Sequence, residues 1–358
     1  MNRGLTVALL AGSFALPVLA QSNAPAADTR GPPHVISLSH FIHAVTRLAP
    51  TTSFYHELFG LEIPAPRPFA GDGPAKLNNV DGLTLSTAFP IIKPDKVRME
   101  FTEFHNVERK GKQALPTDPG SIQLVLHVRD LDSVVDAAKR LSAPIVTTGG
   151  APVRIDTVNG PRRAIVIRDP DGYMVRVIED TPEEATTAGQ LQAGIALDIG
   201  VTNLKDTMKW YQEDLGMTAT GETQFRSDKA MTELVGGPAK SEYREASVQL
   251  PMSNAHLIFT EWRGMPRTKF HERVPDPGAG GFVARVSDLN GMVKMFRAQN
   301  IHLESKGNAP VWFGKTVYDV FIEDPNGVNL ELFQNISLEQ QKQGNFRSNA
   351  AAHANHGG

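Results

Sequence analysis

Three side chains that can move a proton or hold a charge stand on strand-like runs in the first half of the chain. They are the carboxylate of Glu100, the imidazole of His127 and the guanidinium of Arg176. Side chains two residues apart share one face of a strand, so His127 shares its face with Gln123. We expect these faces to point into one cavity, where such a set could transfer a proton and stabilise a developing oxyanion.

The elements that must position these residues recur four times. A β-like run ending in Val-x-x-Leu leads each time into a helical pattern, at Val45–Leu48, Val128–Leu131, Val201–Leu204 and Val286–Leu289. The steps between these motifs are 83, 73 and 85 residues. Short β-like runs separated by Gly, Pro, Asn and Asp follow each helical pattern, which predicts a repeated βαβββ unit.

A longer period shows that the chain is also a repeat of two halves. Phe54-Tyr55 recurs as Trp210-Tyr211, at an offset of 156 residues. Asp169-Pro-Asp-Gly recurs as Asp324-Pro-Asn-Gly, at an offset of 155 residues. The second pair of segments predicts tight turns between strands, because Pro fixes one φ angle and Gly supplies a conformation that other residues avoid.

Helix boundaries are predicted from capping residues. In the first half, residues 50–53 should open a helix that Gly60 ends, and in the second half Asn203 should open a helix that Gly216 ends. Two further helices are expected at 130–141 and 288–299, where apolar residues recur at helical spacing.

The composition favours a soluble, two-domain protein. The chain has 358 residues, of which 41% are hydrophobic, and a net charge of -3 with the two signs interspersed. This gives no electrostatic footprint for nucleic acid or for an anionic membrane. The absence of Cys excludes a thiol nucleophile, an iron–sulfur cluster and disulfides.

Both ends of the chain are predicted to lie outside the domains. Residues 1–20 have a basic start, an apolar stretch and a small-residue cleavage site, which indicates a cleaved signal peptide and a periplasmic or secreted protein. Residues 21–33 form a flexible lead-in and 338–358 a disordered tail. The domains are expected at 34–181 and 190–337, joined by a linker at 182–189.

The repeated units resemble the vicinal oxygen chelate superfamily, which includes glyoxalase I, extradiol dioxygenases and bleomycin resistance proteins. The resemblance rests on the βαβββ order, on the helices containing Phe54-Tyr55 and Trp210-Tyr211, and on the strands that follow the two Asp-Pro turns. It covers roughly residues 35 to 335 and implies an α+β fold, in which four βαβββ units form two tandem open-barrel domains.

In that superfamily, metal ligands come from the first and last strands of each unit, so the resemblance implies one complete potential site in each half. In the first half these positions carry His40, Glu100, Gln123 and Arg176. His40, Glu100 and Gln123 would resemble the mixed ligands of glyoxalase I and could hold one divalent ion: Zn, Ni, Mn or Fe.

Arg176 stands where the family usually has a glutamate. If its guanidinium entered the same cavity, it would pair with Glu100 and oppose a dication. We therefore favour a metal-free cavity with an internal ion pair over a metal site.

The second half departs further from the pattern. Its corresponding positions carry Ala196, Ile258, Gly281 and Glu331, of which only Glu331 matches the family. A His-His-Glu iron site of the extradiol type is therefore absent from both halves. Strand alternation still gives this half a candidate ligand cavity, with Asp198, His256, Arg285 and Glu331.

Two functions compete on this evidence. The first is a lyase, isomerase or epimerase that acts on a small carbonyl or hydroxy compound in the first-half cavity, with Glu100 or His127 moving the proton and Arg176 or a metal holding the oxygen. The second is a metal-free protein that sequesters a small molecule, as in the bleomycin-resistance branch. A homodimer is compatible with either.

Overall fold

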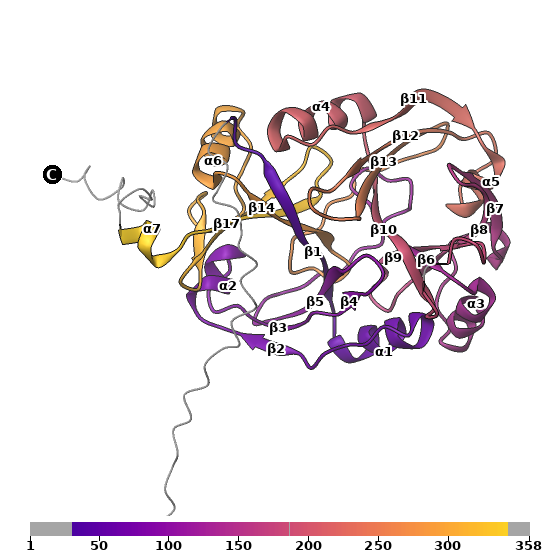
Figure 1. The fold of residues 1–358 in the computed structure, drawn as a ribbon, viewed down its shortest axis with the longest axis horizontal. Helices are drawn as coiled ribbons and strands as arrows, with labels where there is room; N and C mark the ends of the chain where they lie inside the picture. Colours follow the sequence, from indigo (N-terminus) through magenta and orange to yellow (C-terminus); the bar gives the residue numbers. More distant parts are fainter. Residues whose placement is uncertain (1–30, 186, 343–358) are drawn as a thin grey trace, which may run out of the picture.

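The predicted architecture of four βαβββ units is confirmed by the computed structural model, which describes residues 31–185 and 187–342 (Figure 1). The predicted signal peptide, most of the predicted lead-in and residues 343–358 of the predicted tail lie outside the described residues. The tail differs from the prediction at its start, because Leu338–Lys342 form a short helix, α7.

The four units have the following elements. The first unit contains β1 (Val35–Val45), α1 (Leu48–Phe59), β2 (Arg67–Phe69), α2 (Asp72–Leu77), β3 (Thr84–Ala88), β4 (Ile91–Ile92) and β5 (Val97–His105). The second contains β6 (Ile122–Val128), α3 (Leu131–Arg140), β7 (Val153–Thr157), β8 (Gly160–Arg168) and β9 (Met174–Glu179). The third contains β10 (Leu191–Gly200), α4 (Leu204–Leu215), β11 (Thr220–Ser227), α5 (Lys229–Leu234), β12 (Glu242–Gln249) and β13 (His256–Arg263). The fourth contains β14 (Gly280–Val286), α6 (Leu289–Ala298), β15 (Val311–Phe313), β16 (Val317–Glu323) and β17 (Asn329–Asn335).

The strands form two sheets, and each sheet joins units from different halves of the chain. The first sheet has the order β15-β16-β17-β14-β1-β5-β3-β2, with β4 paired to β5. The second sheet has the order β11-β12-β13-β10-β6-β9-β8-β7. The antiparallel pairs β1–β14 and β6–β10 make the two central joints. The first sheet therefore combines units one and four, and the second combines units two and three.

This pairing contradicts the expectation that each half holds one complete site. β1 and β6 belong to the same half, yet they lie in different sheets. Helices, in contrast, pack within the halves, since α1 contacts α3 and α4 contacts α6. In Figure 1, α1 and α3 lie along the lower edge of the molecule, whereas α4 and α6 lie along the upper edge. The halves are thus connected in two ways: helices pair within each half, and two strand pairs, β1–β14 and β6–β10, join one half to the other.

Each main helix is anchored to the last strand of its own unit. The first backbone N–H of α1 donates to Glu103 Oε2 at 2.9 Å, and that of α4 donates to Glu261 Oε2 at 2.7 Å. Glu179 and Gln334 accept the same bond from α3 and α6. A side chain that accepts from an unpaired N–H stabilises a helix start.

Local caps agree with the sequence at three of the four predicted boundaries. Asn203 accepts from the first turn of α4, and Gly60 and Gly216 end their helices at φ 64° and 72°. The start of α1 differs, because it begins at Leu48, ahead of residues 50–53. Glu103 supplies the acceptor that no residue before Leu48 provides.

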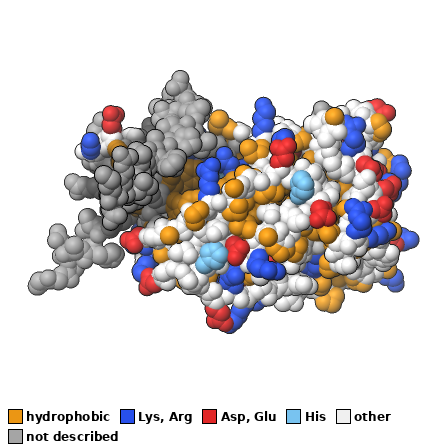
Figure 2. Space-filling view, turned by 90° about the horizontal axis from the view of Figure 1, so that it is seen from below, with side chains coloured by type: hydrophobic (Ala, Val, Ile, Leu, Met, Phe, Trp, Pro, Cys, Tyr) orange, Lys and Arg blue, Asp and Glu red, His pale blue; other side chains and the backbone are white. Residues whose placement is uncertain are grey.

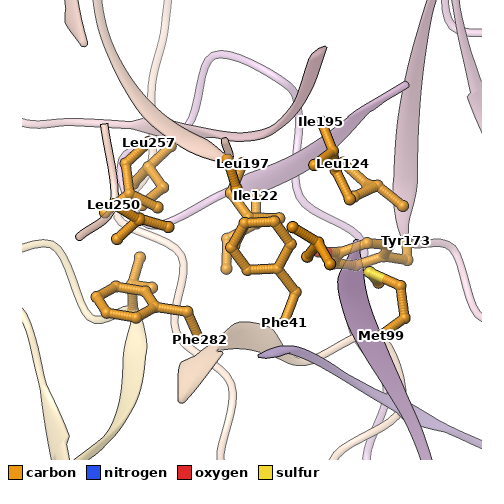
Figure 3. Packing of buried hydrophobic residues seen from close by; sticks show 14 of the residues in the cluster. Phe41, Met99, Ile122, Leu124, Tyr173, Ile195, Leu197, Leu250, Leu257 and Phe282 are labelled. Carbon is orange, nitrogen blue, oxygen red and sulfur yellow. The ribbon is translucent and has the colours of Figure 1, made fainter. Parts of the chain in front are cut away.

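The main core lies between the two sheets and under the helices. Figure 3 shows Phe41, Met99 and Phe282 of the first sheet facing aliphatic side chains of the second, including Ile122 and Leu197. Phe41 and Phe282 are fully buried. Burying one such side chain stabilises the folded state by roughly 1.5–3 kcal/mol. This contact therefore stabilises the packing of the two sheets against each other. The strand faces that turn away from it remain for a site.

Charged side chains of both signs are scattered over the part of the face in Figure 2 that grey atoms leave visible. This distribution agrees with the small net charge of the chain. In the described part of the chain, no helix is long and apolar enough to cross a membrane.

Candidate active site

The first sheet curves around a cavity of about 230 Å³. Its walls come from strands of the first unit and of the fourth unit, with α2 and β15 at its edge. Most of the lining is apolar. The polar lining side chains that carry the chemistry are His40, Thr87, Glu100, Thr102, Asp319, Asn329 and Glu331.

On the first-unit side, His40 and Glu100 form the centre of a hydrogen-bonded row. His40 Nε2 lies 2.6 Å from Glu100 Oε2, and the Thr102 hydroxyl donates to Glu100 Oε1 at 2.6 Å. Thr87 and Ser39 extend the row at its two ends. Burial would raise the pKa of Glu100, but its bond to His40 and the charges of His40 and Arg98 hold that pKa below its ordinary value. Glu100 is therefore ionised near neutral pH.

On the fourth-unit side, two further carboxyl groups face each other. Glu331 lies on β17 and Asp319 on the neighbouring β16. Burial raises the pKa of Glu331 well above its ordinary value, and the adjacent charge of Asp319 adds to this effect. Burial likewise raises the pKa of Asp319 to about 7, although its bond to Glu331 offsets part of the shift. The pair holds a proton under conditions in which Glu100 has none.

The fourth family position on this sheet cannot carry a ligand. Gly281 occupies it, and a Cβ atom there would come within 1.9 Å of the Asn329 carbonyl oxygen. Strand β17 approaches so closely that only glycine fits. His40, Glu100 and Glu331 are therefore the side chains present at the family positions of the first sheet.

The chemistry of this cavity suits a divalent cation. Three carboxyl groups line the cavity together with the imidazole of His40, and Asp319 Oδ1 is buried without a hydrogen-bond partner. Imidazole and carboxylate are ligands of Zn²⁺, Mn²⁺, Ni²⁺ and Fe²⁺, and a cation would offset the repulsion among the acids. His40, Glu100 and Glu331 are thus suitable ligand types for a metal, although their ligand atoms do not all lie within 4.8 Å of one another.

In the second sheet, the polar side chains at the family positions bond to each other. The guanidinium of Arg176 forms a salt bridge with Asp198 and donates to Gln123 Oε1 at 3.4 Å. Thr260 donates to Asp198 at 2.7 Å. Gln123, Arg176 and Asp198 are at most 4% exposed. This inner face is a closed, charge-paired core.

Two predicted groupings are therefore wrong. Gln123 cannot join His40 and Glu100 as a ligand, and Arg176 cannot pair with Glu100, because β6 and β9 lie in the second sheet. The reason for favouring a metal-free cavity disappears with that pairing. Of the second-half candidates, Glu331 and Arg285 lie on the first sheet, whereas Asp198 and His256 lie on the second.

His127 lies at the end of β6, away from Glu100. Its Nδ1 is 2.6 Å from Asp180 Oδ1, and its side chain is 25% exposed. The structure therefore does not bring together the proposed catalytic set of Glu100, His127 and Arg176.

One compact group of three ligand-type side chains occurs among the described residues. Ligand atoms of His43, Asp169 and Asp171 lie within 4.8 Å of one another. His43 Nε2 is 2.6 Å from Asp169, while Asp171 accepts from the backbone of Thr46 and the hydroxyl of Thr51. Because protein donors already use these oxygens, we interpret the group as a clamp between β1, α1 and the Asp-Pro turn.

Sequence reasoning missed Asp319. A signal for it exists, since it is the one acid inside the apolar run Val317–Ile322. Its place on the third strand of its unit, outside the family's ligand positions, hid it. Asn329 lines the same cavity.

Two sheets built from paired βαβββ units, with one acid- and imidazole-bearing cavity, define a tandem glyoxalase-like protein. The model of the Glyoxalase/Bleomycin resistance protein/Dioxygenase superfamily matches residues 37–177 and 194–332. The chain belongs to this superfamily. No curated protein matches the sequence.

Solved structures give the same fold. Glyoxalase I from Zea mays superposes with a TM-score of 0.52 at 17% identity, covering 85% of this chain and 92% of that chain. A mutant of glyoxalase I from Zea mays gives a TM-score of 0.53 at 17% identity, with 85% and 94% covered. At this identity the likeness concerns the fold.

Proposed function

We propose that this protein is a lyase, isomerase or epimerase that acts on a small carbonyl or hydroxy compound in the cavity of the first sheet. The observation that carries the proposal is the convergence of two pairs of titratable side chains on one cavity. His40 with Glu100 comes from the first unit, and Asp319 with Glu331 comes from the fourth. A single enclosed site can then both remove and return a proton.

The two pairs differ in protonation, which suggests separate roles. Glu100 is ionised and can accept a proton from a carbon next to a carbonyl group. The Asp319–Glu331 pair holds a proton and can deliver it from the fourth-unit side of the cavity. Groups whose environments drive their pKa values apart are suited to acid and base roles in one reaction.

A bound metal would complete this site. His40, Glu100 and Glu331 would have to move closer together to hold the ion, which when bound supplies a Lewis acid for a substrate oxygen. His40 would then be kept in place through its Nδ1 atom, which lies 2.9 Å from Ser39 Oγ. Orientation of this kind is the usual role of the second nitrogen of a ligating histidine.

Localisation is part of the same proposal. The basic start, apolar stretch and small-residue site of residues 1–20 support export to the periplasm or beyond. Fractionation of cells that produce the full chain tests this, with a variant lacking residues 2–20 as the control. Retention of the full chain in the cytoplasm contradicts export.

Deuterium exchange tests the proposed chemistry without requiring the natural substrate. The protein is incubated in D₂O with a panel of 2-hydroxy ketones and 2-oxo aldehydes, and label next to the carbonyl carbon is followed by NMR. We expect catalysed exchange or conversion for at least one compound. Loss of Glu100 as base in Glu100→Gln should reduce it by about 10²–10⁴-fold.

The matched control is Glu245→Gln, which alters a partly exposed carboxyl group near Asp198 and Arg176 in the second sheet. It should leave exchange unchanged. Equal losses in both variants contradict the assignment of the site. Tight binding of a ligand that is always recovered unlabelled and unconverted supports the sequestering function instead.

A further inference from the structure

The charge of the cavity restricts which ligands it can accept. The side chains that line it include three acids, Glu100, Asp319 and Glu331, and no Lys or Arg. Glu100 is ionised, so the lining carries negative charge even while the Asp319–Glu331 pair holds a proton. A ligand carboxylate or phosphate would meet like charges in a poorly solvated space, where repulsion is stronger than in water.

Two arginines lie near the cavity without lining it. Arg98 sits over the ring of Phe89, with its guanidinium carbon 5.8 Å from the ring centre. Phe89, and not Arg98, lines the cavity. Arg285 is on the cavity-facing side of β14, two residues beyond Val283, which does line it. Neither guanidinium is part of the lining, although the charge of Arg98 lowers the pKa of Glu100.

The rest of the wall is apolar and largely aromatic. Six phenylalanines contributed by both units line the cavity: Phe69, Phe89, Phe104, Phe313, Phe321 and Phe333. The volume of about 230 Å³ exceeds the roughly 150 Å³ of an engineered cavity that binds benzene. A benzene ring with a few substituents would fill the space, and its oxygen atoms could reach the acid groups.

We infer that the ligand of this cavity is an uncharged hydroxy or carbonyl compound with an aromatic ring or an apolar group of similar size. The inference rests on the proposed function in that it uses the same cavity, but it concerns recognition and not turnover. It excludes acids, phosphate esters and thioesters of large anionic carriers as ligands of the enclosed space.

Three probes of matched structure test this inference by calorimetric titration of the full chain at about pH 7. The first is 1-phenyl-1,2-ethanediol, the second is mandelate, in which a carboxylate replaces the terminal alcohol, and the third is propane-1,2-diol, which lacks the ring. We expect the first to bind at least about tenfold more tightly than either of the others.

Variants connect the selectivity to the cavity. Asp319→Asn removes one acid and should narrow the gap between the phenyl diol and mandelate. Glu213→Gln, on the exposed side of α4, should leave it unchanged. Equal or tighter binding of mandelate by the unaltered chain overturns the inference, as does equal binding of the diol without a ring.

The outcome is separable from that of the deuterium experiment. Selective binding of the phenyl diol without any catalysed exchange supports the inference and contradicts the proposed function. Catalysed exchange on an anionic compound, with mandelate bound at least as tightly as the phenyl diol, supports the proposed function and contradicts the inference about the ligand.

Discussion

The two sheets use one scaffold for opposite purposes. In the first, the family positions carry His40, Glu100, Gly281 and Glu331; His40 is bonded to Glu100, whereas Glu331 faces a second acid, Asp319. In the second, they carry Gln123, Arg176, Ala196 and Ile258, and the one cation is bonded to Asp198. The first inner face encloses a cavity, and the second is packed with Arg176 and its partners.

The difference shows where binding energy remains available. Charges that are already paired inside a protein have their partners and offer nothing to a ligand. Acids that oppose each other raise the free energy of the empty site, and a proton or a cation relieves it. We therefore place the proposed function in the first sheet and interpret the second sheet as a support for it.

Breaking the balanced pair should give the largest effect on stability. In Arg176→Met, Asp198 stays buried without its cation, and we expect the free energy of unfolding to fall by about 3–5 kcal/mol. Urea denaturation measures this. The double variant Arg176→Met with Asp198→Leu should recover most of the loss. An unchanged midpoint in the single variant would show that the pair is not a structural unit.

The acid pair of the first sheet should make the free energy of unfolding depend on pH. The folded pKa of Asp319, about 7, lies above its ordinary value of 3.8, so folding favours its protonated form. Its contribution to stability is full below about pH 4 and is lost as the pH rises through 7. Between about pH 5 and 8 this loss amounts to roughly 2–3 kcal/mol.

Asp319→Asn should remove that part of the pH dependence. The measurement is the free energy of unfolding at about pH 5 and 8, with a chelator present, for the variant and the unaltered chain. Asp180→Asn, on the second-sheet side, is the control. Parallel curves for the Asp319 variant and the unaltered chain would count against a buried acid pair.

The smallest effect should come from His127, the second-sheet residue that the sequence placed among the catalytic candidates. Its pair with Asp180 is partly exposed, so His127→Ala should cost no more than about 1 kcal/mol of stability. Turnover should be unchanged, because His127 does not line the cavity. A loss of turnover without a loss of stability would reopen its role as a proton shuttle.

The sequence alone predicted the units, the turns and most helix ends, because these depend on local spacing. Gly60, Asn203 and Gly216 act where their residue types indicate. The start of α1 was not predictable in this way, since Glu103 caps it from a distant strand.

Only the part of the site that comes from one unit could be predicted from the sequence, because the rest depends on contacts between distant units. His40 and Glu100 come from one unit, so the repeat alone brings them together. Equivalent units present equivalent strand edges, and the chain order does not say which unit β1 will pair with. The pairing with β14 depends on long-range packing, and it is what adds Glu331 and Asp319 to the cavity.

The most direct test of the account compares Glu331→Gln with Gln123→Ala in turnover of an identified substrate. Both residues occupy family ligand positions, one in each sheet. If the site joins the first and fourth units, Glu331→Gln should lose about 10²-fold or more, while Gln123→Ala keeps its activity. A loss confined to Gln123→Ala would contradict the account and place the chemistry in the second sheet.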